Sequence, residues 1–243
     1  MTPNKPDFIG GIGSGPPKLP KIQLPAKGAG CSMLLLLLLI VGGWLYFAFL
    51  EYVRPNEYGI KEIQIGVNRG IQEGTYEAGL HFVLPFGFQK IHRLPRHVQV
   101  LELTDINYGT AASSSEGSVY YDKPATIQTS DGFFVNVDVT ILYKIIDPYL
   151  VVTQLGTGMQ FLHQGVLPKA EPFLKQSLGE LTTEEFYDSP LRVEKAEKAR
   201  QLLDAELSPL GIKVDQVLVR YFKYTDEIQE NIEAKKLQDQ LVF

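Results

Sequence analysis

The stretch MLLLLLLIVGGWLYFAFL, residues 33–50, decides how this chain is organised, because it contains no charged residue and no proline. Twelve of its 18 residues are Leu, Ile, Val or Phe. A helix of that length spans roughly 27 Å, close to the ~30 Å hydrocarbon core of a bilayer. The sequence therefore predicts a single transmembrane helix that includes Met33, Leu38, Trp44 and Leu50, and it predicts membrane lipid as a partner.

Two other interpretations of this stretch are a buried core helix and a cleaved signal peptide. A buried core helix that is apolar on all sides is rare in a domain of this size. A cleaved signal peptide would need a small-residue cleavage site, but the chain continues directly into Glu51, Tyr52 and Arg54. The sequence therefore favours an uncleaved anchor.

The residues before the span differ sharply from those after it. Residues 1–32 are rich in Pro and Gly and carry a net charge of +3, and we expect them to be disordered because they have too few large apolar residues to offset their ordering entropy. Lys18, Lys21 and Lys27 lie before the span, against Arg54 and Lys61 after it. This bias predicts a cytoplasmic N-terminus, with the larger domain on the opposite side of the membrane.

The chain after the span is acidic, with 19 basic and 27 acidic residues. Phosphate binding needs a concentrated basic face, so this composition argues against nucleic acid as a partner. It also argues against docking on anionic lipid by charge alone.

Hydrophobic periodicity predicts strands first and helices later, which is an α+β pattern with a mixed sheet. The clearest strand is FFVNVDVTILYKI, residues 133–145, where seven apolar residues alternate with polar ones. The pattern of GIKVDQVLVRYF, residues 211–222, predicts a returning strand with a bulge near Asp215.

Several helix signals lie between those two strands. Asp147 is a capping residue followed by Pro148, and Thr182 with Glu185 forms a Thr-x-x-Glu capping box. Pro168 and Pro172 interrupt an otherwise helical pattern, so we expect at least one kink or break there.

Four segments occur in an order that resembles the SPFH (band 7) family, which includes stomatins, prohibitins, flotillins and the HflK/HflC pair. They are RPNEYGI (54–60), GTYEAGLHFVLPF (74–86), TSDGFFVNVDVTILYKIIDP (129–148) and LGIKVDQVLVRYFKYTDEI (210–228). The resemblance implies two subdomains, residues 51–127 and 128–224, followed by the start of an oligomerisation helix at 225–243. The Ser-rich loop within 108–124 is longer than the family needs, and the chain stops early in its last helix.

The resemblance implies a scaffold rather than an enzyme. Such proteins form homo- or hetero-oligomeric rings or cages that organise a membrane patch or restrain a membrane protease, in the bacterial or mitochondrial inner membrane. The alternative is a single-pass adaptor or receptor domain that binds a protein partner without higher assembly.

The residues themselves give no sign of catalysis, a cofactor or a metal site. The four histidines are His81, His92, His97 and His163. His92 and His97 lie five residues apart, with no Cys, Asp or Glu at metal-ligand spacing. We therefore expect no enzyme activity, no cofactor and no metal.

Two groups of residues are candidate contact sites. Phe86 and Phe88 lie in the Pro/Gly-containing segment LHFVLPFGF, where they either fill a small core or dip into the membrane interface. A second group forms an incomplete apolar stripe on the last helix, and it consists of Ile228, Ile232, Leu237 and Leu241. This helix either folds back on its own sheet or, as we favour, packs against the same helix of adjacent subunits.

Overall fold

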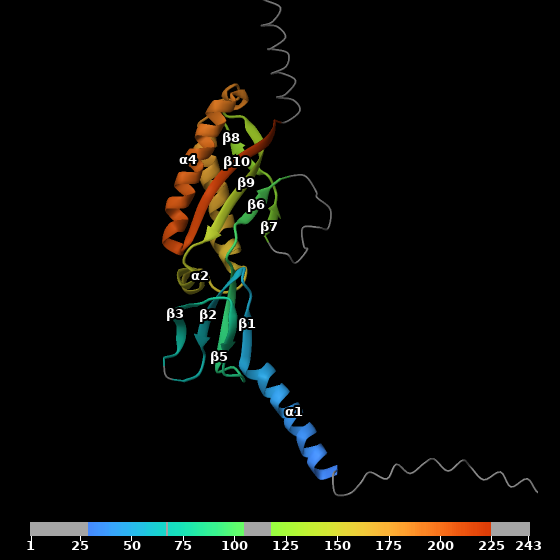
Figure 1. Cartoon of the computed structure of the whole chain (residues 1–243). Coiled ribbons are helices and arrows are strands. Elements are labelled where there is room, and N and C mark those ends of the chain that lie inside the picture. Colours follow the sequence, from blue (N-terminus) through green and yellow to red (C-terminus); the bar gives the residue numbers. More distant parts are fainter. Residues whose placement is uncertain (1–28, 67, 105–117, 225–243) are drawn as a thin grey trace, which may run out of the picture. The chain divides into compact units, whose positions relative to one another are not determined.

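The computed structural model describes residues 29–66, 68–104 and 118–224 (Figure 1). The chain divides into two compact units, Met1–Tyr46 and Phe47–Phe243, and each is described by itself. Most of the Pro/Gly-rich tail and the predicted oligomerisation helix with its apolar stripe lie outside the described residues.

Helix α1 (Ala29–Phe49) has the length and composition to cross a membrane, and none of its window Ser32–Phe49 is buried within the protein. Its bounds differ from the predicted ones at both ends. The helix begins at Ala29, inside the segment predicted to be disordered. It ends at Phe49, because Leu50 pairs with Phe82 as the first residue of a strand and so leaves the helical conformation.

Two small antiparallel sheets follow the helix, and each strand is short. The first is a ribbon of two strands, and the second has three strands in the order β3-β2-β5. Their bounds are β1 (Leu50–Val53), β2 (Glu57–Ile63), β3 (Gly70–Tyr76), β4 (Gly79–Phe82) and β5 (Gln89–Pro95).

A core of three residues joins the ribbon to the three-stranded sheet: Val53, Val83 and Ile91 are all buried together. Gly59 of β2 permits this close packing. A Cβ atom at Gly59 would lie 3.0 Å from Val53 and 3.1 Å from both Ile91 and Tyr76.

A larger sheet of five strands forms the second half of the fold. The order is β10-β9-β6-β7, with β8 paired to the other end of β9, and β6 runs parallel to β7 while the remaining pairs are antiparallel. The strands are β6 (Gln99–Leu103), β7 (Val119–Asp122), β8 (Ala125–Gln128), β9 (Phe134–Ile145) and β10 (Ile212–Tyr224).

This sheet agrees with the sequence-based expectations in three respects. It is mixed, the strand predicted at 133–145 is β9, and a register shift between Val214 and Gln216 marks the predicted bulge. The predicted subdomain boundary at residue 127 falls inside β8, so the sheet takes strands from both sides of it.

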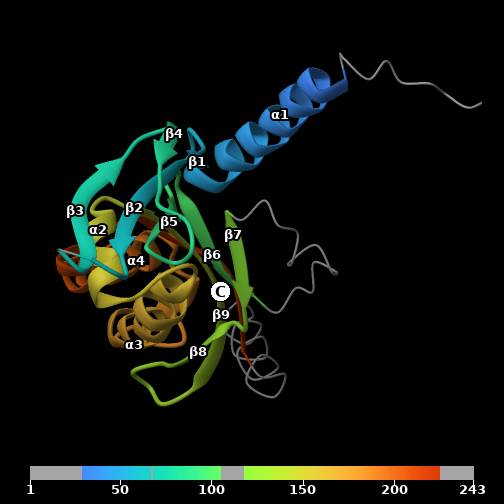
Figure 2. The ribbon, with the colours of Figure 1, turned by 90° about the horizontal axis from the view of Figure 1, so that it is seen from below.

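Six helical segments lie between β9 and β10. They are α2 (Pro148–Gln154), a π-helix at Phe161–Val166 (η2), α3 (Leu167–Leu178), a 3₁₀ turn at Glu185–Tyr187 (η3), α4 (Ser189–Leu207) and a 3₁₀ turn at Ser208–Leu210 (η4). Helices α3 and α4 cover one face of the five-stranded sheet (Figure 2), whereas α2 packs against β2 and β3 of the three-stranded sheet.

The helix caps follow the sequence signals. The Asp147 carboxylate accepts bonds from the backbone N–H groups of Tyr149 and Leu150 at 3.0 and 3.1 Å. Thr182 and Glu185 exchange reciprocal bonds at 2.9 and 3.2 Å, which confirms the capping box.

The predicted interruption near Pro168 takes the form of the π-helix. Proline has no N–H to donate, and its ring would clash with the carbonyl four residues earlier in a regular helix, so the turn before it widens. Pro172, in contrast, lies inside the continuous helix α3. Lys195 and Lys198 of α4 donate to Glu180, which lies two residues after the end of α3, and they hold the pKa of that carboxyl at about 2.

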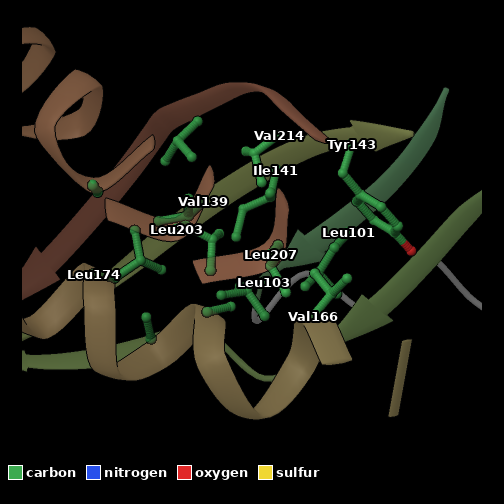
Figure 3. Close-up of a cluster of buried hydrophobic side chains, with 14 of the residues drawn as sticks. Leu101, Leu103, Val139, Ile141, Tyr143, Val166, Leu174, Leu203, Leu207 and Val214 are labelled. Carbon is green, nitrogen blue, oxygen red and sulfur yellow. The ribbon is translucent and has the colours of Figure 1, made fainter. Parts of the chain in front are cut away.

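The main core lies between the sheet and its helices (Figure 3). Alternate residues of β9, such as Val139, Ile141 and Tyr143, are fully or nearly fully buried. Val139 and Ile141 lie on the side of Leu203 of α4, whereas the Tyr143 ring lies at the other end of the cluster, 6.4 Å from the Phe161 ring of the π-helix. Burial raises the pKa of the Tyr143 hydroxyl well above its usual range.

The entrance to β10 depends on one glycine. Gly211 has φ +84°, its carbonyl accepts bonds from Ile146 and Asp147, and a Cβ atom there would lie 2.3 Å from the Asp147 carbonyl oxygen. Only glycine therefore fits this turn without a shift of the backbone.

Candidate membrane-contact surface

The β1–β4 ribbon follows helix α1 directly and has two unlike faces. Because side chains alternate along a strand, the pairs Leu50–Phe82 and Tyr52–Leu80 share one face, and the pairs with Glu51 and Val53 share the other. The exposed fractions of Tyr52, Leu80 and Phe82 are 52%, 53% and 59%. One face of the ribbon is thus apolar and exposed.

The other face of the ribbon packs on the protein. Val53 is fully buried, and Glu51 accepts a bond from the Arg93 guanidinium at 2.9 Å. These contacts fix which face turns outward, so the apolar face cannot rotate into the core.

The ribbon is also tied to the end of the apolar helix. The Phe49 and Phe82 rings stack with their centroids 5.6 Å apart, and the Val83 N–H donates to the Phe49 carbonyl at 2.8 Å. The residues that end the helix and the exposed face of the ribbon therefore belong to one packed unit.

The turn between β4 and β5 extends the apolar face. Phe86 is 77% exposed and has φ +62°, a conformation in which a bulky residue is a genuine outlier. A local hydrogen bond between the Gln89 N–H and the Leu84 carbonyl at 3.2 Å closes this turn. Strain of this kind persists only where the surrounding structure holds it.

The turn between β2 and β3 lies beside the turn between β4 and β5 and adds one more exposed apolar residue, Ile65. The N–H groups of Gln64 and Ile65 both lie within bonding distance of the Phe88 carbonyl, at 2.9 and 3.4 Å. Ile65 is 53% exposed and Phe88 is 42% exposed. The two turns therefore lie side by side, and we call their described residues, 64–66, 68–69 and 83–88, the tip.

The exposed apolar residues of the ribbon and of the turn that follows it are together called the apolar ribbon surface: Tyr52, Leu80, Phe82, Leu84, Phe86 and Phe88. Contiguous exposed apolar patches mark protein or membrane contact sites. Of the two predicted alternatives for Phe86 and Phe88, the exposed fractions do not support the core role, and the membrane-interface role stays a prediction.

The sequence did not indicate Tyr52, Leu80, Phe82 or Leu84 as members of this surface. Each strand of the ribbon has only four residues, too few for periodicity to show which face is buried. The pairing register with the buried Val53 decides it.

The histidines contact protein groups at separate places. His92 bonds to Glu62 at 2.6 Å, and this bond lowers the pKa of the Glu62 carboxyl. His81 bonds to the Glu77 carbonyl at 2.6 Å, and His163 packs edge-on against Tyr120. Within the described ranges, no group of three or more His, Cys, Asp or Glu side chains could hold a metal ion.

A packed aromatic cluster holds the end of β10, just before the predicted oligomerisation helix. Tyr224 contacts Phe186, Tyr187 and Phe222, and its hydroxyl donates to the Thr183 carbonyl at 3.1 Å. Burial raises the pKa of the Tyr224 hydroxyl well above its usual range. Whatever follows residue 224 therefore starts from a fixed position on the domain.

A pair of variants separates stability from membrane contact at this surface. We expect replacement of Phe86 and Phe88 together by Ser to leave the melting temperature of residues 47–243 unchanged and to abolish liposome binding by that fragment. Replacement of the buried Ile91 by Ala should instead lower the free energy of unfolding by about 2–5 kcal/mol, because it leaves a cavity.

Thermal unfolding and liposome co-sedimentation measure the two effects. A large fall in melting temperature for the double Phe variant would assign these rings to the core. If the fragment without the span never binds liposomes, the membrane-contact role is wrong.

Comparison with known proteins agrees with this architecture. The model of the SPFH domain / Band 7 family matches residues 52–241. An uncharacterized protein of Methanothermobacter thermautotrophicus is 24% identical over 199 residues, which cover 82% of this chain and 52% of that protein. The chain thus spans about half the length of this relative. Because the family model matches most of the chain, this protein belongs to the SPFH domain / Band 7 family.

Proposed function

We propose that this protein is a membrane-anchored scaffold that assembles into a large ring or cage. The observation that carries the proposal is one helix long enough to span a bilayer, followed at once by an SPFH domain. The exposed apolar face of the ribbon supports it, because that face suits contact with the same membrane. SPFH domains are associated with membrane scaffolds and generally with no enzyme activity.

The assembly would organise the membrane patch it encloses, restrain a membrane protease, or both. Lateral packing of residues 225–243 from adjacent subunits is the interface we propose, through the stripe that contains Ile228 and Ile232. The Lys/Arg bias favours a cytoplasmic N-terminus, with the SPFH domain on the opposite side of a bacterial or mitochondrial inner membrane.

Particle size tests this proposal most directly. In mild detergent, a ring or cage elutes as a megadalton-scale particle, whereas a single-pass adaptor elutes as a monomer or dimer. We expect the large particle, by size-exclusion chromatography with light scattering. A monomer or dimer over the accessible concentration range would favour the adaptor and rule out the scaffold.

A further inference from the structure

The tip of the domain carries a charge unlike that of the rest of the domain. Neither of its two turns, residues 64–69 and 83–88, contains an Asp or Glu. Arg69 lies in the first turn, and Lys90 follows the second by two residues. Across residues 51–224 as a whole, acidic residues outnumber basic ones by 22 to 17. The domain as a whole is therefore acidic, whereas its tip is basic.

Both cations are exposed, and each is placed by a local contact. The Arg69 Nε donates to the Gln64 carbonyl at 2.9 Å, which fixes the base of the guanidinium across its own turn. Lys90 lies in β5 opposite Glu62, the residue just before the first turn.

The carboxylate nearest to the tip in the sequence is already engaged. Glu62 accepts a bond from His92, which lies two residues beyond Lys90 on the same strand. Lys90 adds a weaker attraction that also lowers the pKa of the Glu62 carboxyl. The Glu62 charge is thus partly offset within the β2–β5 pair.

We propose that the tip binds anionic lipid headgroups, with Phe86 and Phe88 in the interface and with Arg69 and Lys90 at the level of the phosphates. Exposed apolar rings beside long cationic side chains are the combination that binds an anionic bilayer surface. This inference rests on the proposed membrane association and adds a lipid preference to it.

The acidic remainder of the domain favours one orientation at an anionic surface. Its charge is repelled by an anionic surface, while the cations of the tip are attracted to it. The two effects together favour an orientation in which the tip meets the membrane. Each cation near an anionic surface contributes about 1 kcal/mol, equivalent to roughly five-fold in the inserted population.

The test uses the full chain reconstituted into vesicles, with one indole as a reporter. Trp44 is the only tryptophan of the chain, so Trp44→Phe combined with Phe86→Trp places the indole at the tip alone. Brominated lipids quench an indole that enters the bilayer. The vesicles contain phosphatidylcholine alone or phosphatidylcholine mixed with phosphatidylglycerol.

We expect stronger quenching in the anionic vesicles, and we expect added salt to reduce it. In those vesicles, Arg69→Gln with Lys90→Gln should lower the inserted population by up to about 25-fold. The matched control, Lys123→Gln with Lys213→Gln, removes the same charge from exposed sites outside the tip and should change nothing.

Each outcome decides the question. Equal quenching in both lipids, or no effect of the double tip variant, would show insertion without a preference for anionic lipid. No quenching in either lipid, also with Phe88→Trp as a second reporter, would show that the tip does not enter the bilayer. Neither result bears on ring assembly, which particle size measures separately.

Discussion

Replacement of Leu38 by Arg will shift a large fraction of the protein out of the membrane, into a soluble or degraded pool. Leu38 lies in the uncharged stretch of α1, near its centre, and is not buried by other parts of the protein. A charge at the centre of a span costs roughly 2.5–3.5 kcal/mol of insertion free energy. Carbonate extraction followed by quantitative blotting measures the effect.

A matched charge elsewhere provides the control. Val193 lies on α4 and is 66% exposed, so Val193→Arg adds the same side chain where water solvates it. We expect this variant to stay fully in the membrane fraction. Membrane association of Leu38→Arg that resists carbonate as well as the parent protein would rule out a single span at α1.

Deletion of the residues after Thr225 will leave a folded, membrane-bound protein whose particle is much smaller. We expect the domain to stay folded because β10, its last described strand, ends at Tyr224 within the packed aromatic cluster. The stripe in residues 226–243 is too narrow to stabilise a lone helix in water, so it needs a neighbour.

Light scattering and thermal unfolding together distinguish the outcomes of this deletion. Ile228→Ser with Ile232→Ser should reproduce the smaller particle without shortening the chain. Unfolding of the shortened protein would show that residues 226–243 pack into the core of the SPFH domain of the same subunit. An unchanged particle size would show that contacts between the sheet domains build the assembly.

Local signals in the sequence predicted several parts of the fold correctly. The alternation of residues 133–145 predicts β9 because one face of this strand packs against helices along its whole length. The capping residues Asp147 and Thr182 act within a few positions of themselves, so their role can be recognised without the rest of the fold. The family resemblance combined such local signals in their order, and the family match confirms it.

The candidate surface was predicted only in part. The aromatic run beside Pro85 and Gly87 singled out Phe86 and Phe88, but composition could not distinguish a buried ring from an exposed one. The turn that holds Phe86 at positive φ lies beside a second turn, and the two meet through the Phe88 carbonyl. That contact joins segments more than 20 residues apart, so it has no local signal.

The sequence by itself determined the apolar span and the α+β order of the elements, because each depends on composition or on short-range periodicity. The resemblance of four segments in their order indicated the family. Tertiary structure decided where helix α1 ends and strand β1 begins, since Leu50 becomes a strand residue only by pairing with Phe82. It also decided that the sheet crosses residue 127 and that the ribbon turns Tyr52 and Leu80 outward. Strand pairing and the burial of Val53 against Ile91 fix these features, and both join residues that are distant in the sequence.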